Sequence, residues 1–281
     1  MSTAARPTKD RIPAASPSEM RLVTVPDFLA AKARGVRLTL LTAYDYTMAR
    51  LLDAAGVDGL LVGDSLGMVV QGQADSLAVT VDEMIYHTKM VVRGARRSLV
   101  VTDMPFMSYQ VSPQQAVESA GRLLKEGGAH AVKLEGGVRC AAALAAITAA
   151  DIPLMGHIGL TPQSVRRLGG FKVQRDAAKL MDDALAVEAA GAFSLVVECV
   201  PTDLAARITE AVKIPTIGIG AGPHCDGQVL VTPDLLGLFD ELRPRFVKQY
   251  ADLGREVREA AEAYCREVRE GTFPAEEHGF R

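Results

Sequence analysis

The stretch GLLVGDSLG, residues 59–67, indicates the fold of the whole chain. Its apolar run between glycines has the length and composition of a strand buried on both faces, and Asp64 and Ser65 follow it directly. The same pattern, a short apolar run that delivers an ionisable side chain, recurs at residues 99–103, 131–135, 154–157 and 195–198. Because the loops at the carboxyl ends of parallel strands converge, we expect these side chains to form one site.

Helical segments separate these strands, and several of them end in glycine. Thr80 with Glu83 predicts a capping box, and Ser112 before Pro113 predicts another helix start. In the helix expected at 175–190, Leu180 and Ala184 lie on the buried stripe and Asp183 lies off it. The expected helices are 46–55, 80–92, 112–126, 138–149, 175–190 and 202–212, and the further strands are 38–45, 215–222 and 229–231. Eight strands in fewer than 300 residues favour an α/β fold, a single-domain (β/α)8 (TIM) barrel, over a doubly wound sheet.

The two ends of the chain differ in composition from the middle. Residues 1–20 are rich in Ala, Ser, Pro and charge and lack periodicity, which predicts a flexible N-terminal arm. Residues 21–281 are expected to form the barrel domain, with a charged amphipathic helical tail of one or two helices at 245–271. Between the fifth and sixth strands, the glycine-rich segment 159–172 is typical of an active-site loop that acts as a lid.

Composition narrows the function classes. The net charge of −3 over 281 residues gives no basic field for nucleic acid or an anionic membrane, so small molecules are the expected partners. The four cysteines form no C-x-x-C pair and are expected to be reduced thiols. No apolar stretch has the length of a transmembrane helix, and we expect a cytoplasmic protein.

The strand-end side chains define the expected site. They are Asp64, Ser65, Asp103, Lys133, Glu135, His157 and Glu198. Three neighbouring carboxylates repel one another unless a cation lies among them, and an oxygen-rich set without a Cys/His cluster favours Mg²⁺. Lys133 shares a strand face with Glu135 and either balances charge or binds a substrate carboxylate. For any single acid, the alternative is a structural role in a salt bridge or a helix cap.

At these residues the sequence closely resembles the ketopantoate hydroxymethyltransferase family. The matching runs are TAYDY (42–46), VGDSLGM (62–68), VT (79–80), YHT (86–88), DMPFM (103–107), VKLEGG (132–137), GHIGLTPQ (156–163), ECVP (198–201) and IGIGAG (217–222). The resemblance covers residues 21–278. It implies a barrel of the phosphoenolpyruvate mutase/isocitrate lyase type that transfers a hydroxymethyl group from 5,10-methylenetetrahydrofolate to 3-methyl-2-oxobutanoate with Mg²⁺, in pantothenate biosynthesis. It also implies a homo-oligomer, a decamer.

The resemblance also implies roles for individual residues. Asp64, Asp103 and Glu135 match the family's metal-site acids. Asp64 and Ser65 match its keto-acid contacts, and Asp103 is assigned to the same substrate-binding group. Lys133 matches the substrate lysine and Glu198 the proposed proton acceptor. His157 either donates a hydrogen bond to the substrate or is a structural histidine at the end of its strand.

The same residues suggest three other interpretations. The run Gly63–Leu66 resembles a serine hydrolase signature, but no histidine follows an aspartate in the D-x-x-H spacing that such enzymes use. A 2-oxo acid lyase or mutase of the phosphoenolpyruvate mutase type shares the barrel, the Mg²⁺ and an enolate; the segment at Glu198–Pro201 favours transfer. A barrel retained as a binding module is disfavoured by the intact lysine and carboxylates.

Overall fold

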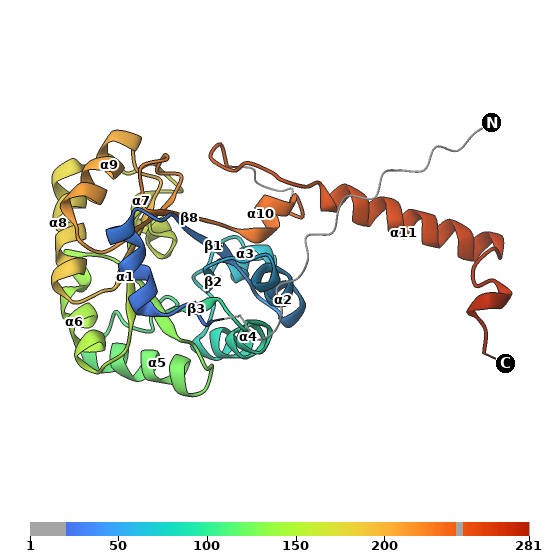
Figure 1. Cartoon of the computed structure of the whole chain (residues 1–281), viewed down its shortest axis with the longest axis horizontal. Coiled ribbons are helices and arrows are strands. Elements are labelled where there is room, and N and C mark those ends of the chain that lie inside the picture. Colours follow the sequence, from blue (N-terminus) through green and yellow to red (C-terminus); the bar gives the residue numbers. More distant parts are fainter. Residues whose placement is uncertain (1–20, 240–243, 281) are drawn as a thin grey trace.

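Eight parallel strands close into a barrel whose spatial order follows the chain from β1 to β8, and β8 pairs with β1 (Figure 1). This computed structural model describes residues 21–239 and 244–280; the expected N-terminal arm, 1–20, lies outside them. The strands are β1 (Leu38–Thr42), β2 (Gly59–Val62), β3 (Leu99–Asp103), β4 (Ala131–Glu135), β5 (Leu154–Gly159), β6 (Ser194–Glu198), β7 (Thr216–Ile219) and β8 (Gly227–Leu230). The predicted (β/α)8 barrel is confirmed.

Most helices fall where glycine and capping signals predict them. Thr80 N donates to Glu83 Oε2 at 2.7 Å and Glu83 N donates to Thr80 Oγ1 at 3.2 Å, so the capping box is confirmed. The α-helices are α1 (Val25–Arg34), α2 (Tyr46–Ala54), α3 (Leu66–Val69), α4 (Val81–Gly94), α5 (Pro113–Lys125), α6 (Ala141–Ala149), α7 (Val165–Leu168), α8 (Ala177–Ala189), α9 (Thr202–Ala211), α10 (Thr232–Leu236) and α11 (Leu253–Glu270). Short 3₁₀ helices lie at η1 (Val138–Cys140), η2 (Pro162–Ser164) and η3 (Glu276–His278).

The barrel has an inner and an outer apolar core because successive strand residues point alternately inward and outward. Leu40, Val101 and Met155 belong to the inner core. Phe28 of α1, a helix additional to those that the sequence predicts, closes this core beside the start of β2. A Cβ atom on Gly59 would lie 3.3 Å from the Phe28 ring, so the glycine makes room for the ring. The inner apolar core ends at the level of the polar residues at the carboxyl ends of the strands.

The prediction that Asp183 lies off the buried stripe of α8 is wrong. Asp183 is buried with Leu180 and Ala184. Its Oδ1 accepts a hydrogen bond of 2.9 Å from Val138 N, and its Oδ2 lies 2.8 Å from Lys179 Nζ. The backbone amide that opens η1 needs an acceptor, and this requirement outweighs the cost of burying the carboxylate.

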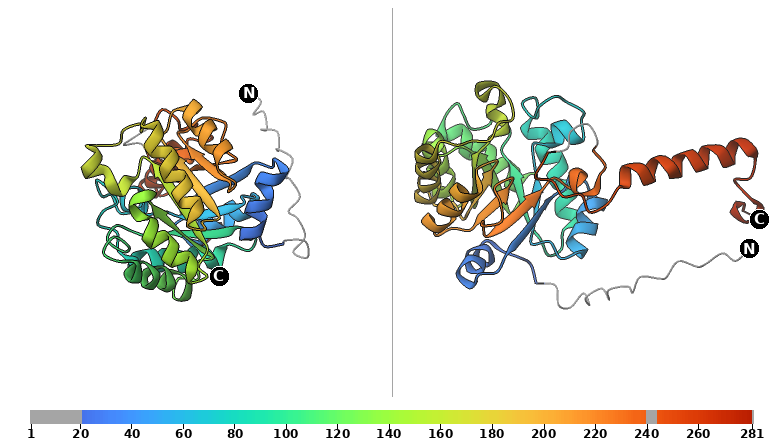
Figure 2. Two further views of the ribbon diagram at one scale, coloured as in Figure 1. Left: turned by 90° about the vertical axis from the view of Figure 1, so that its left-hand side faces the viewer. Right: turned by 90° about the horizontal axis from the view of Figure 1, so that it is seen from above.

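The outer layer of the barrel is least complete around β1 and β8, where Thr39 and Gln228 are exposed. The tail is a single helix, α11, which extends away from the barrel and has no buried residue (Figures 1 and 2). Val257, Tyr264 and Val268 form an exposed stripe along it. In the part of the chain that the structure describes, no helix is long and apolar enough to span a membrane.

Candidate active site

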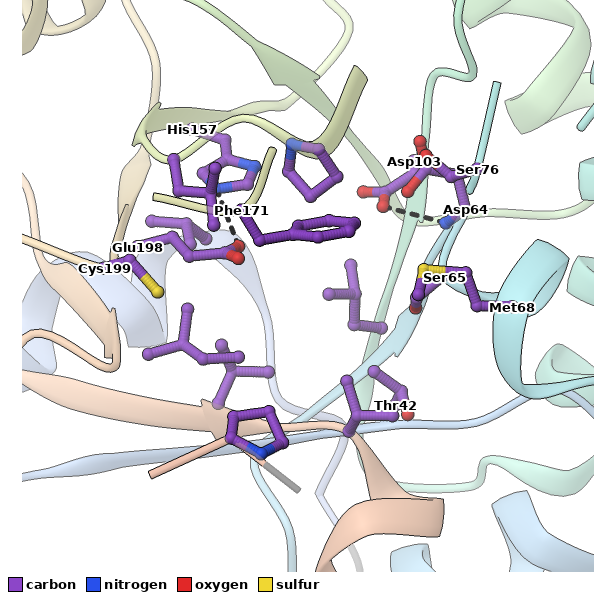
Figure 3. Close-up of a pocket in the computed structure, with 18 of the residues that line it drawn as sticks. Thr42, Asp64, Ser65, Met68, Ser76, Asp103, His157, Phe171, Glu198 and Cys199 are labelled. Carbon is purple, nitrogen blue, oxygen red and sulfur yellow. Dashed lines mark hydrogen bonds and ion pairs between the residues drawn. The ribbon is translucent and has the colours of Figure 1, made fainter. Parts of the chain in front are cut away.

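Strand register brings the predicted residues to one end of the barrel. Asp103 pairs with Lys133 across β3 and β4, and Glu135 pairs with His157 across β4 and β5. These positions alternate with outward-facing apolar residues, so their side chains point into the barrel. All seven predicted site residues line a single cavity of about 350 Å³. Figure 3 shows Asp64, Ser65, Asp103, His157 and Glu198 in this cavity. The structure therefore brings the whole predicted set together.

Asp64, Asp103 and Lys133 form the first cluster in this cavity. Asp64 N donates to Asp103 Oδ2 at 3.0 Å, and Asp103 Oδ1 lies 3.0 Å from Lys133 Nζ. Burial raises the pKa of Asp64, and the neighbouring carboxylates of Asp103 and Glu135 raise it further, to about 8. Burial alone would lower the pKa of Lys133, but the three carboxylates raise it, so the ammonium stays charged.

Glu135, His157 and Glu198 form the second cluster. His157 Nδ1 lies 3.1 Å from Lys133 Nζ and 3.5 Å from Glu135 Oε1, and His157 Nε2 lies 3.2 Å from Glu198 Oε2. Burial and the Lys133 ammonium oppose a charge on the ring, but the two carboxylates outweigh them and raise the pKa of His157 to about 9. Because the ammonium only donates, a neutral ring accepts at Nδ1. In both protonation states the proton on Nε2 therefore faces Glu198.

Gln163 of η2, to which the sequence assigns no role, joins the two clusters. Its Nε2 donates to Asp64 Oδ2 and to Met104 O, both at 2.9 Å, and its backbone N donates to Glu135 Oε2 at 3.0 Å. The amide orientation is fixed because Oε1 accepts from Tyr109 OH at 2.6 Å. The expected lid segment 159–172 is thus tied to two strand-end acids through one buried residue, whose side chain binds Asp64 and whose backbone N binds Glu135.

Ser65 lies at the start of α3, immediately after Asp64. Its Oγ is 2.9 Å from the hydroxyl of Tyr44, another residue whose role the sequence did not indicate. Tyr44 is buried, and burial raises its pKa, so the phenol stays protonated. This pair orients the Ser65 hydroxyl beside Asp64. The signal that would have found Tyr44 is its position just beyond β1, equivalent to that of Asp64 beyond β2.

The acids fit a magnesium ion held by few protein ligands. Among residues 21–239 and 244–280, no group of three or more Asp, Glu, His or Cys side chains is arranged to hold a metal ion. Mg²⁺ does not need such a group, since it commonly binds one or two carboxylates and takes its other ligands from water and substrate. Asp103 Oδ1 is buried without an aligned hydrogen bond, and Asp64 and Asp103 repel each other. A divalent cation would remove both costs.

The fold and the cavity at the carboxyl ends of the strands, which we call the barrel mouth, together define a class: a (β/α)8 barrel with charged side chains gathered at its strand ends. The fold is similar to that of 2,3-dimethylmalate lyase, a PEP mutase/isocitrate lyase superfamily member (TM-score 0.58, 16% identity, 92% of both chains). It is also similar to phosphonopyruvate hydrolase solved with oxalate and Mg²⁺ (TM-score 0.60, 14% identity, 90% of this chain and 93% of that one).

The sequence narrows this class to one family. The family model for ketopantoate hydroxymethyltransferase matches residues 22–276. The 3-methyl-2-oxobutanoate hydroxymethyltransferase of Clostridium beijerinckii is 60% identical over 262 residues, covering 92% of this chain and 95% of that protein. The enzyme of that name from Moorella thermoacetica is 59% identical, covering 92% and 98%. The chain belongs to the ketopantoate hydroxymethyltransferase family, as the resemblance at the strand ends predicted.

Proposed function

We propose that this enzyme transfers a hydroxymethyl group from 5,10-methylenetetrahydrofolate to 3-methyl-2-oxobutanoate and forms 2-dehydropantoate, a step of pantothenate biosynthesis. The observation that carries the proposal is the acid-rich mouth, in which a lysine and a histidine lie among four carboxylates. C3 of the keto acid loses a proton and forms a bond to the one-carbon unit. Water supplies the hydroxyl group, and tetrahydrofolate leaves.

The first cluster is suited to hold the keto acid. Asp64 and Asp103 would hold Mg²⁺, with Glu135 beside it directly or through a water. When bound, Mg²⁺ supplies a Lewis acid that polarises the 2-oxo acid and makes C3 more acidic. Lys133 is charged and reaches the mouth from β4, so it binds the substrate carboxylate. Ser65, held by Tyr44, donates a hydrogen bond to the substrate.

The second cluster is suited to proton transfer. Glu198 is the most exposed of the strand-end acids, with 16% of its side chain accessible, so it faces the substrate space. We assign it as the base that removes the C3 proton. His157 Nε2 lies 3.2 Å from Glu198 Oε2 without an aligned hydrogen bond, and its Nδ1 lies beside Lys133 and Glu135. We therefore propose that the ring positions the Glu198 carboxylate. The alternative is that His157 is a purely structural residue.

The test is to incubate the enzyme with Mg²⁺, 3-methyl-2-oxobutanoate and methylenetetrahydrofolate labelled with ¹³C in the one-carbon unit. We expect the label in the hydroxymethyl group of the product, with loss when Mg²⁺ is chelated. Carbon–carbon cleavage of 2-oxo acid adducts without labelled product would instead indicate a lyase of the phosphoenolpyruvate mutase type.

We also propose that the chain works as a homo-oligomer, a decamer, in the cytoplasm. The exposed apolar stripe of α11 and the open outer faces of β1 and β8 favour burial against other copies. The four cysteines are free thiols, as a reducing compartment requires. Sedimentation of the full chain should give one species of about ten subunits, and removal of residues 253–281 should give smaller ones.

A further inference from the structure

One more carboxylate lines the cavity, on the side away from the charged strand ends. Asp234 lies on α10, which follows β8. In the closed ring β8 lies between β7 and β1, across the mouth from β4, which carries Lys133 and Glu135. Asp234 is close enough to Tyr44 to act on it electrostatically. It therefore belongs to the cavity but not to either acid cluster.

Asp234 differs from the strand-end acids because its carboxylate has no hydrogen-bond or ion-pair partner among residues 21–239 and 244–280. Asp64, Asp103 and Glu135 each accept a hydrogen bond or face a cation, whereas no described residue donates to the Asp234 carboxylate or pairs with it. The side chain is half-buried, and burial is the sole cause that raises its pKa, to about 6. An unpaired carboxylate in a partly desolvated position gains free energy when N–H donors reach it.

A structural role for Asp234 in its own helix does not account for it. It is in the first turn of α10, a helix of five residues, but its side chain accepts no hydrogen bond from the backbone amides there. Leu235 N donates to Val231 O instead. The carboxylate is thus left for a group that enters the cavity.

The surroundings of Asp234 are apolar and aromatic. Val231, Phe239, Pro244 and Phe246, from the segment after β8, line this side of the cavity. Phe171 of the expected lid segment points into the same cavity, beside His157 and Glu198 (Figure 3). A ligand that fits here has a flat, largely apolar body and adjacent N–H donors at one edge, because a carboxylate accepts two parallel hydrogen bonds.

We propose that Asp234 binds the 2-amino and N3–H edge of the pteridine ring of the one-carbon donor, and so selects the donor and orients its ring. The proposal rests on the proposed function, since it assumes a pterin-borne one-carbon unit. It places the two substrates on opposite sides of one mouth. The keto acid lies on the β2–β6 side and the pterin lies on the β8 side.

The test compares two ligands on two proteins. Tetrahydrofolate and its 2-desamino analogue, which lacks the amino group, are titrated by calorimetry against the wild type and Asp234→Asn. Wild type should bind the analogue about 10- to 100-fold more weakly than tetrahydrofolate, as expected for hydrogen bonds to a charged group. Asp234→Asn should lose a similar factor in its affinity for tetrahydrofolate, and it should bind the two ligands about equally. Asp203→Asn, an exposed acid in the first turn of α9, is the matched control and should behave as wild type.

The outcomes separate the two proposals. An Asp234→Asn enzyme that still prefers tetrahydrofolate by the wild-type factor would overturn the role of Asp234. A wild type that transfers no one-carbon unit at all would contradict the proposed function instead. Exchange of the C3 hydrogen of the keto acid in D₂O, measured on Asp234→Asn with tetrahydrofolate present, verifies that the variant is folded. The loss in affinity for the one-carbon donor should exceed any loss in affinity for the keto acid at least tenfold.

Discussion

The two sides of the barrel mouth are built differently. On the β2–β6 side, residues at fixed strand positions deliver acids, a lysine and a histidine that are buried and bonded to one another. On the β8 side, residues that follow the last strand supply aromatic and apolar side chains and one carboxylate, Asp234, with which no described residue pairs. This difference matches our proposals, in which the β2–β6 side carries out the chemistry on the small keto acid and the β8 side recognises a larger flat substrate.

Asp103→Ala tests the β2–β6 side with the largest expected effect. It removes one of the two acids that we assign to Mg²⁺ and leaves Lys133 without its ion pair. Turnover should fall by about 10³-fold or more, since metal catalysis contributes several kcal/mol. Steady-state assays over a range of Mg²⁺ concentrations measure this loss. Full activity at ordinary Mg²⁺ would remove Asp103 from the metal site.

Lys133→Met sharpens the comparison between the two substrates. The change keeps much of the apolar stem and removes the charge, so keto-acid binding should weaken by about 10- to 100-fold while tetrahydrofolate binding changes much less. Calorimetric titration of each substrate separately measures both values. Equal losses for the two substrates would contradict a division of the mouth into a keto-acid side and a pterin side.

Gln163→Met breaks the link between the lid segment and the acids. The side chain keeps its length but no longer donates to Asp64 and Met104. Because groups that orient metal ligands typically contribute 10- to 100-fold, Mg²⁺ affinity should fall by about tenfold. Gln114→Met, on an exposed position of α5, is the matched control. Unchanged Mg²⁺ affinity in Gln163→Met would leave Gln163 a packing residue of the lid.

The pH dependence of metal affinity gives the smallest effect. The pKa of Asp64 is raised to about 8, so below that pH a cation must displace a proton from it. Mg²⁺ affinity should therefore rise with pH, by about fivefold between pH 7 and 8, and level off above. Calorimetry in buffers of different ionisation enthalpy also counts the released proton. An affinity that is flat over this range would mean that Asp64 is already ionised at neutral pH.

Whether a site residue could be predicted from the sequence depends on the kind of element that carries it. The strand-end residues were identifiable because the alternation along a buried strand and its terminal position together fix where a side chain points. Tyr44 lies just beyond β1 and Asp234 lies in the first turn of α10, and the pattern of a buried strand that ends in an acid does not cover these positions. Gln163 was not identifiable, because it lies in an irregular segment whose course depends on tertiary contacts. Asp183 was placed wrongly for the same reason, since its partner amide, at Val138, lies 45 residues away in the chain.

Glu198 is the residue that we assign to removal of the C3 proton, on the β2–β6 side of the barrel mouth. The direct measurement is exchange of the C3 hydrogen of 3-methyl-2-oxobutanoate in D₂O with Mg²⁺, by proton NMR, for wild type and Glu198→Gln, without and with tetrahydrofolate. Glutamine keeps the size of the side chain but does not accept the proton. Exchange and turnover should fall together by about 10²- to 10⁴-fold, as for a lost general base. Exchange at the wild-type rate in Glu198→Gln, with keto-acid binding intact, would mean that another group removes the C3 proton.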